Sequence, residues 1–155
     1  MLFCGVINTN KGESMYTYKC KVKKVVDGDT VVVDIDLGFN IIVADQTIRL
    51  SGIDTPESRT TNKEEKERGL LSKKKLSEKL STNAYYTIQT VKEDNNDDKF
   101  GRILGVFLNE DGSSVNQWMV DNNYAVSYTG ANKELLQEAH GINKQKLVER
   151  GEIKG

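Results

Sequence analysis

The sequence predicts an α+β protein, mainly β, in which a small five-stranded barrel carries three helices. Five short segments are rich in β-branched and aromatic residues, and turn residues separate them. Three other segments repeat apolar residues at helical spacing. The chain has 155 residues, of which 37% are hydrophobic. That is enough for one domain with a buried core.

Three strands are expected in the first third of the chain. Residues 16–26 alternate loosely between apolar and polar side chains, and residues 30–36 are mostly β-branched. Asp27-Gly28 between them is a strong hairpin signal, so the two strands should pair antiparallel. Residues 41–50 supply a third strand, whose irregular stretch at residues 44–46 indicates a bulge or a turn.

A helix and two more strands should follow. Residues 62–80 are rich in Lys and Glu and carry a thin apolar stripe, which predicts an amphipathic helix resting on the sheet. Residues 84–91 and 100–108 are expected to be the fourth and fifth strands. A helix inserted after the third strand and two helices after the fifth are typical of an oligonucleotide-binding (OB) barrel with added helices.

Two helices are expected after the fifth strand. Ser113 or Ser114 can cap the first, and Asn132 can cap the last. Residues 1–14 show no clear period and are expected to be a loose tail, so the domain is assigned to residues 15–155. The last helix is expected to bury one side, formed by Leu135, Leu136, Ala139, Ile142 and Leu147.

Composition narrows the possible partners and metals. The net charge of −1 argues against a broad basic surface but permits a local cationic cleft. No apolar run approaches the ~20 residues of a membrane span, and the N-terminus shows no secretory signal, so a cytoplasmic protein without a membrane partner is expected. Two separated cysteines and the single His140 cannot form a zinc site. Any metal should therefore be bound by oxygen, as Ca²⁺ and Mg²⁺ prefer.

One stretch, from Arg49 to Glu57, combines a cation, two carboxylates and the one proline of the chain. Pro56 fixes its own φ and favours an extended Thr55, so the geometry between Asp54 and Glu57 should be stiff. This pattern suits metal-assisted attack on a phosphate. A strand that ends in a proline turn with solvated charges around it is an equally good interpretation of this stretch alone.

Three segments taken together predict a function more specifically than the stretch from Arg49 to Glu57 alone. Asp27-Gly28-Asp29-Thr30, the stretch from Arg49 to Glu57, and Asp98-Lys99-Phe100-Gly101-Arg102 occur in this order and at these separations. In combination they closely resemble the staphylococcal (micrococcal) nuclease family, the Ca²⁺-dependent thermonucleases. The resemblance implies a Ca²⁺-dependent phosphodiesterase that cuts DNA, and also RNA, to 3′-phosphate products. A monomer is expected.

The resemblance also implies roles for particular residues. Asp29 and Asp54, with the backbone carbonyl of Thr55, match the metal ligands. Glu57 matches the glutamate that activates or orients the attacking water; an alternative is a structural ion pair with Arg49 or Arg59. The residues that match contacts to substrate phosphate or base are Arg49 and Arg102 as the phosphate clamp, Lys99 as a phosphate-binding lysine, and Tyr128 as a base-stacking tyrosine.

Two other functions are compatible with the barrel. Nuclease-like barrels that have lost their catalytic residues serve as binding modules, but such a module would be expected to lack at least one residue of the catalytic set, and this chain retains them all. A barrel that binds single strands through aromatic stacking is less favoured, because most aromatic residues are explained as core. The sequence departs from the family at Phe100, where tyrosine is usual, which affects substrate binding rather than the catalytic set.

Overall fold

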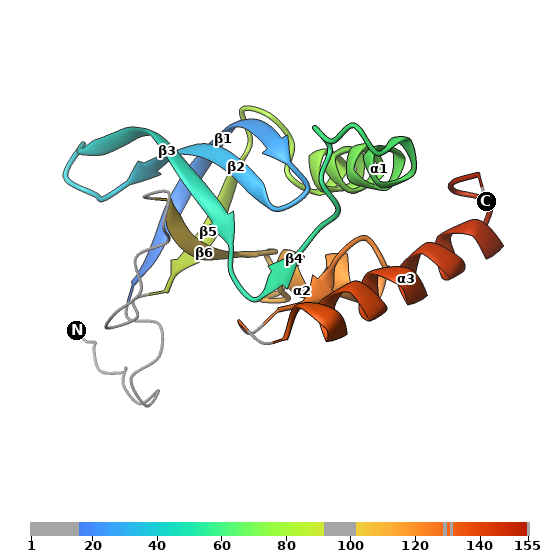
Figure 1. Cartoon of the computed structure of the whole chain (residues 1–155). Helices are drawn as coiled ribbons and strands as arrows, with labels where there is room; N and C mark the ends of the chain where they lie inside the picture. Colours follow the sequence, from blue (N-terminus) through green and yellow to red (C-terminus); the bar gives the residue numbers. More distant parts are fainter. Residues whose placement is uncertain (1–15, 92–101, 129, 131, 155) are drawn as a thin grey trace.

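The computed structural model describes residues 16–91, 102–128, 130 and 132–154. Within these residues, five strands close into a barrel in the order β1-β2-β3-β6-β5 (Figure 1). The barrel strands are β1 (Thr17–Asp27), β2 (Thr30–Asp36), β3 (Ile42–Leu50), β5 (Tyr85–Thr90) and β6 (Ile103–Leu108). The α+β barrel with helices is therefore confirmed, and each barrel strand lies where the sequence pattern predicts one.

Two details of strand pairing follow from the local sequence. Asp27 pairs with Thr30 across the β1–β2 hairpin, so Gly28 and Asp29 form its two-residue turn. On β3, the register advances by one extra residue between Val43 and Gln46 relative to β2. The extra residue makes a β-bulge, as the sequence indicated, and Asp45 adopts a positive φ of 54° there.

The three helices begin where capping residues predict. Asn62 caps α1 (Lys63–Lys79) by accepting hydrogen bonds from the backbone N–H groups of its first turn. Ser114 caps α2 (Val115–Asp121), and Asn132 caps α3 (Lys133–Glu149) in the same way. Helix α1 packs against β1, α2 against β6, and α3 against β7.

A second, two-stranded sheet was not predicted. It pairs β4 (Ile53–Asp54) with β7 (Val126–Ser127), antiparallel. The sheet extends through a hydrogen bond from the backbone N–H of Tyr128 to the carbonyl oxygen of Gly52. The pairing connects the stretch that follows β3 to the segment in front of α3, and in Figure 1 β4 lies between the barrel and α3.

The core fills the barrel and the space beneath α1 and α2. Its largest fully buried side chains include Phe107, Ile48, Leu50, Leu76 and Met119. The predicted buried side of α3 was partly wrong: Leu147 is buried, but Leu135 is 61% exposed and Ile142 is 49% exposed. Helix α3 lies over a two-residue strand, which is too small to cover a wide apolar stripe.

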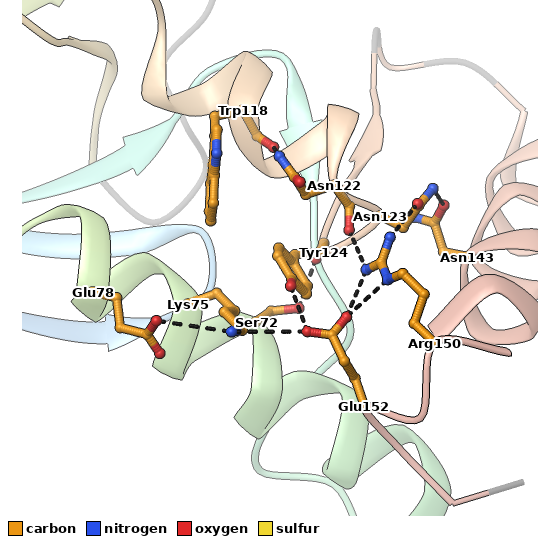
Figure 2. Close-up of polar contacts among 10 residues, drawn as sticks. All are labelled: Ser72, Lys75, Glu78, Trp118, Asn122, Asn123, Tyr124, Asn143, Arg150 and Glu152. Carbon is orange, nitrogen blue, oxygen red and sulfur yellow. Dashed lines mark hydrogen bonds and ion pairs between the residues drawn. The ribbon is translucent and has the colours of Figure 1, made fainter. Parts of the chain in front are cut away.

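Polar contacts join the end of the chain to α1 and to the turn after α2 (Figure 2). The Tyr124 hydroxyl donates to Glu152 Oε1 at 2.6 Å, and Arg150 Nη2 lies 2.7 Å from Glu152 Oε2. The Arg150 guanidinium also donates to the Asn122 carbonyl oxygen at 2.7 Å and to Asn123 Oδ1 at 3.0 Å. This C-terminal network fixes the exit of α3 relative to the rest of the fold.

Two predictions fall outside the described residues: the loose tail assigned to residues 1–14, and Lys99 with its neighbours. Within the part of the chain that the structure describes, no helix is long and apolar enough to cross a membrane.

Candidate active site

Asp29 lies at the tip of the β1–β2 hairpin, next to the end of β3. Its carbonyl oxygen accepts a hydrogen bond from the backbone N–H of Leu50 at 2.8 Å. Its side-chain Oδ1 accepts from the hydroxyl of Thr30 at 3.0 Å. The side chain is 14% exposed. The turn therefore holds a carboxylate beside the point where β3 leaves the barrel.

Arg49 connects two acidic residues from separate segments. Its Nη2 atom lies 3.4 Å from Asp29 Oδ2 and 3.6 Å from Asp54 Oδ1. Its Nη1 atom donates to the Leu50 carbonyl oxygen at 2.8 Å. The guanidinium is 13% exposed and the Asp54 side chain 30%, so the three side chains form a group at the barrel rim that is open to solvent at Asp54. Two carboxylates that share one cation lie close to one another.

Asp54 is placed by β4 and has a second partner. Its backbone pairs with Val126 of β7, and its Oδ2 atom lies 2.8 Å from Nε2 of His140 on α3. One carboxylate oxygen therefore faces Arg49 and the other faces His140. The sequence prediction did not connect His140 to this site.

Glu57 follows Asp54 by three residues and is held by α1. Its backbone N–H donates to Glu65 Oε2 at 3.2 Å, while its side chain is exposed at the edge of the site. In the described part of the chain, the acids of Asp29 and Asp54, and not Glu57, form the ion pairs of Arg49. The structural ion pair with Arg49 is therefore not seen.

The pKa of Glu57 is raised from its usual 4.5. Partial burial is the largest cause, followed by the negative charges of Asp27, Asp29, Glu65 and Asp54. A concentration of carboxylates around one point favours a bound cation, because the cation relieves their mutual repulsion.

Small residues let α1 approach the two loops that carry the acids. A β-carbon at Gly28 would come within 2.7 Å of the Ser72 side chain on α1 and 3.1 Å of Thr55. Ser72 is buried and donates to the Tyr124 carbonyl oxygen at 2.6 Å. The turn, the buried Thr55 and the helix are therefore packed together, which fixes Asp29 relative to Asp54.

Arg102 lies directly before β6, the strand that pairs with the strand of Arg49. Strands β3 and β6 are parallel, with Ile48 opposite Ile103 and Arg49 opposite Leu104. Side chains alternate along a strand, so an extension of β6 by one residue would put Arg102 on the face of Arg49 and not on that of the core residue Ile48. The pairing therefore places the start of β6, which Arg102 precedes, beside the end of β3, which carries Arg49.

Tyr128 lies at the end of β7, two residues after the partner of Asp54. Its side chain is exposed, and its backbone N–H is bound to Gly52. Tyr124 is buried, as expected for a core residue. The ring of Tyr128 is thus accessible on the sheet that carries Asp54.

The donors fit a hard cation bound by oxygen. No group of three or more His, Cys, Asp or Glu side chains with metal-binding geometry occurs among the described residues. Asp29 and Asp54, however, present carboxylate oxygens to a single cationic nitrogen, and Thr55 lies directly after Asp54. Two carboxylates and a carbonyl leave most positions of a Ca²⁺ ion for water and for substrate oxygens.

The barrel and its acidic, arginine-containing rim define the class of protein: an OB-type barrel of the nuclease kind. The chain belongs to the staphylococcal nuclease homologue family, whose family model matches residues 47–149. It is also similar to the endonuclease YhcR of Bacillus subtilis (strain 168), with 33% identity over 116 residues. This alignment includes 72% of the chain but only 9% of the length of YhcR.

The sequence prediction named Asp29, Arg49 and Asp54, which the structure brings together, but it did not include His140. A usable signal was present, since Leu136, His140, Asn143 and Leu147 recur at spacings of four, three and four residues. That pattern places His140 on the inward face of α3. The prediction included Leu136 and Leu147 of this pattern, but it added the exposed Leu135 and Ile142 and left out His140.

Proposed function

We propose that the protein is a Ca²⁺-dependent phosphodiesterase that hydrolyses DNA, and also RNA, to 3′-phosphate products, and that residues 15–155 form its nuclease domain. The observation that carries the proposal is the position of Arg49, within 3.6 Å of both Asp29 and Asp54, with Glu57 beside the same acids. A cation already occupies the space between the carboxylates in the form of a side chain. A metal ion and a phosphate can take over these contacts together.

Asp29, Asp54 and the carbonyl of Thr55 are the residues proposed to hold the ion. When bound, Ca²⁺ supplies positive charge that neutralises and orients the phosphodiester. The two aspartates come from different segments, so their separation depends on the packing of Gly28, Ser72 and Thr55. The metal site should therefore be rigid before substrate arrives.

Arg49 is proposed to turn from the carboxylates to the phosphate once the ion is bound. Its planar paired donors match two phosphate oxygens, and its charge persists at any working pH. Arg102, directly before the neighbouring strand β6, is proposed to hold the phosphate together with Arg49. Charge that develops on these oxygens in the transition state is stabilised by both guanidinium groups.

Glu57 is proposed to accept a proton from the attacking water. The water oxygen forms a bond to phosphorus, the bond to the 5′-oxygen breaks, and the leaving oxygen takes up a proton. A bound cation lowers the pKa of Glu57 and keeps it ionised, and an ionised carboxylate has the free lone pair that a general base needs. Lys99 and Tyr128 are proposed to bind a flanking phosphate and a base, respectively.

The test is digestion of labelled single- and double-stranded DNA and RNA with Ca²⁺, with Mg²⁺ and with a chelator. Cleavage should require Ca²⁺, stop with EDTA and resume on addition of excess Ca²⁺. Arg102→Ala and Glu57→Gln should each remove most of the cleavage while the thermal unfolding temperature stays near that of wild type. An Arg102→Ala protein as active as wild type would reject this mechanism, and binding without cleavage by the wild type would indicate a non-catalytic module.

A further inference from the structure

We propose that His140 is a positioning residue that holds the Asp54 carboxylate in the orientation that directs one oxygen to the metal ion. This inference rests on the proposed metal-binding role of Asp54. The positioning role of His140 follows from one contact, the 2.8 Å approach of its Nε2 atom to Asp54 Oδ2. It follows also from the backbone segments that hold this contact in place.

The contact orients the carboxylate. An ionised carboxylate can only accept a hydrogen bond, so Nε2 of His140 carries the proton and donates it. With Oδ2 bound to the ring, Oδ1 is directed to the side of Arg49 and Asp29, 3.6 Å from Arg49 Nη2. A freely rotating carboxylate would have no fixed plane relative to the ion. His140 therefore fixes Asp54 as a ligand that offers Oδ1 to the shared cation.

The distance between the two side chains is set by a common strand. Asp54 pairs with Val126 of β7. On α3, Asn143 lies three residues after His140 and donates to the carbonyl oxygen of Ala125 at 2.9 Å. Because both residues are fixed to the same short segment, movement of α3 away from the barrel also moves β7 and β4. The contact is thus maintained by backbone geometry.

The buried position of the His140 ring lowers the free energy of unfolding. Its other nitrogen, Nδ1, is buried and has no hydrogen-bond partner among the described residues. A buried polar atom without a partner destabilises a fold. The side chain is only 15% exposed, so solvent does not fully compensate. A role in stability alone therefore does not explain a histidine here, whereas orientation of Asp54 does.

Partners in the outer shell of a metal site commonly change the metal affinity 10- to 100-fold when they are removed. Removal of His140 should accordingly weaken Ca²⁺ binding by a factor of that order. Glutamine can place its Nε2 donor close to the position of the histidine Nε2, whereas asparagine is too short to do so. A comparison of His140→Gln with His140→Asn therefore tests whether a donor at the position of the histidine Nε2 is required, because the two side chains differ little in polarity.

The experiment is a Ca²⁺ titration without substrate, followed by the backbone amide NMR signals of Asp54 and Thr55. Wild type should show saturable shifts. His140→Ala and His140→Asn should raise the Kd for Ca²⁺ about 10- to 100-fold, and His140→Gln should restore most of the affinity. Lys144→Gln is the matched control, because Lys144 is one turn further along α3 and pairs with Glu64 at 2.6 Å, outside the acids of the site. Its Kd should match that of wild type.

Asp29→Asn separates the two proposals. If it abolishes Ca²⁺ binding while His140→Ala and His140→Asn bind as wild type does, the metal site stands and the positioning role is wrong. If Asp29→Asn binds Ca²⁺ as wild type does, the metal site is wrong and the positioning role is rejected with it. Equal loss in His140→Gln and His140→Asn, with unchanged unfolding temperatures, would also overturn the role, because the donor position would not matter.

Discussion

Gly69 of α1 lies against the backbone carbonyl group of Glu57. A β-carbon built at position 69 would clash with the carbonyl carbon and oxygen of Glu57 and with the backbone nitrogen of Ser58, which lies at 2.6 Å. Backbone atoms cannot rotate away from such a contact as a flexible side chain can. The absence of a side chain at residue 69 thus sets how closely α1 approaches the glutamate of the site.

Gly69→Ala should therefore lower both stability and activity. The added methyl group must displace either α1 or the segment at Glu57, and overpacking of this kind costs roughly 1–3 kcal/mol. The better helix propensity of alanine, about 1 kcal/mol, offsets only part of that cost. Thermal unfolding measures the first effect, and the single-turnover cleavage rate measures the displacement of Glu57. A variant with wild-type stability and rate would show that the close approach has no consequence.

Gly141→Ala should have the opposite effect on stability. Gly141 also lies inside a helix, but nothing is within 4 Å of a β-carbon built there. Without a clash, the helix propensity of alanine should raise the free energy of unfolding by up to about 1 kcal/mol. Denaturant titration of the two glycine variants beside wild type checks both signs. If both variants were destabilised, α3 would have to depend on Gly141 in a way that open space does not explain.

The barrel strands were predictable because local signals agree with the final fold. The β-branched run of β2 and the Asp27-Gly28 turn specify a hairpin without help from the rest of the chain. The sheet of β4 and β7 was not predictable, since two-residue strands have no period. That sheet depends on tertiary contacts, such as the hydrogen bond from the backbone N–H of Tyr128 to the carbonyl oxygen of Gly52.

The same distinction applies to the site. Asp29, Arg49 and Asp54 could be selected because each belongs to a motif within its own segment. His140 belongs to no such motif, and its contact with Asp54 depends on how α3 packs against β7. The apolar side chains of Leu135 and Ile142 suggested the wrong face of that helix, although both are exposed. A few polar contacts decide how a helix is oriented over a small surface. The hydrophobic pattern of the sequence does not indicate these contacts.

Arg49→Lys should leave the fold intact and remove most of the activity. Lysine keeps a positive charge near Asp29 and Asp54, so the acids remain compensated. It loses the planar pair of donors that matches two phosphate oxygens. The loss of one well-placed donor to a transition-state charge commonly costs about 2.7–4 kcal/mol, which is roughly 10²- to 10³-fold in kcat. The single-turnover cleavage rate at saturating Ca²⁺ measures this loss of activity.

Arg59→Lys is the matched control for Arg49→Lys. Arg59 lies two residues after Glu57 and is exposed, and it has no place in the proposed phosphate clamp. Its rate should stay close to that of wild type. Equal rates for Arg49→Lys and wild type would mean that only the charge at position 49 matters, which would contradict the paired-donor role.

Glu152 connects the end of the chain to Tyr124 and Arg150 in the C-terminal network (Figure 2). Burial alone raises the pKa of Glu152, but the hydrogen bonds from Tyr124 and Arg150 and the charges of Arg150 and Lys75 outweigh it, so the pKa falls below its usual 4.5. The folded state therefore holds the ionised form more strongly than the unfolded state does. The resulting stability is present above about pH 4.5 and is lost as the pH falls towards the lowered pKa.

Glu152→Gln should destabilise the protein most at neutral pH and least in acid. Hydrogen bonds to charged groups contribute about 1.5–3 kcal/mol, so a loss of that order is expected at pH 7. As the pH falls below 4.5, wild type loses the same contribution and the two unfolding curves should converge. Glu149→Gln makes the same charge change at an exposed position three residues earlier. Its free energy of unfolding should follow the same pH dependence as that of wild type. A gap between wild type and Glu152→Gln that stays constant from pH 7 to pH 3 would show that packing of the side chain, and not its charge, holds the chain end in place.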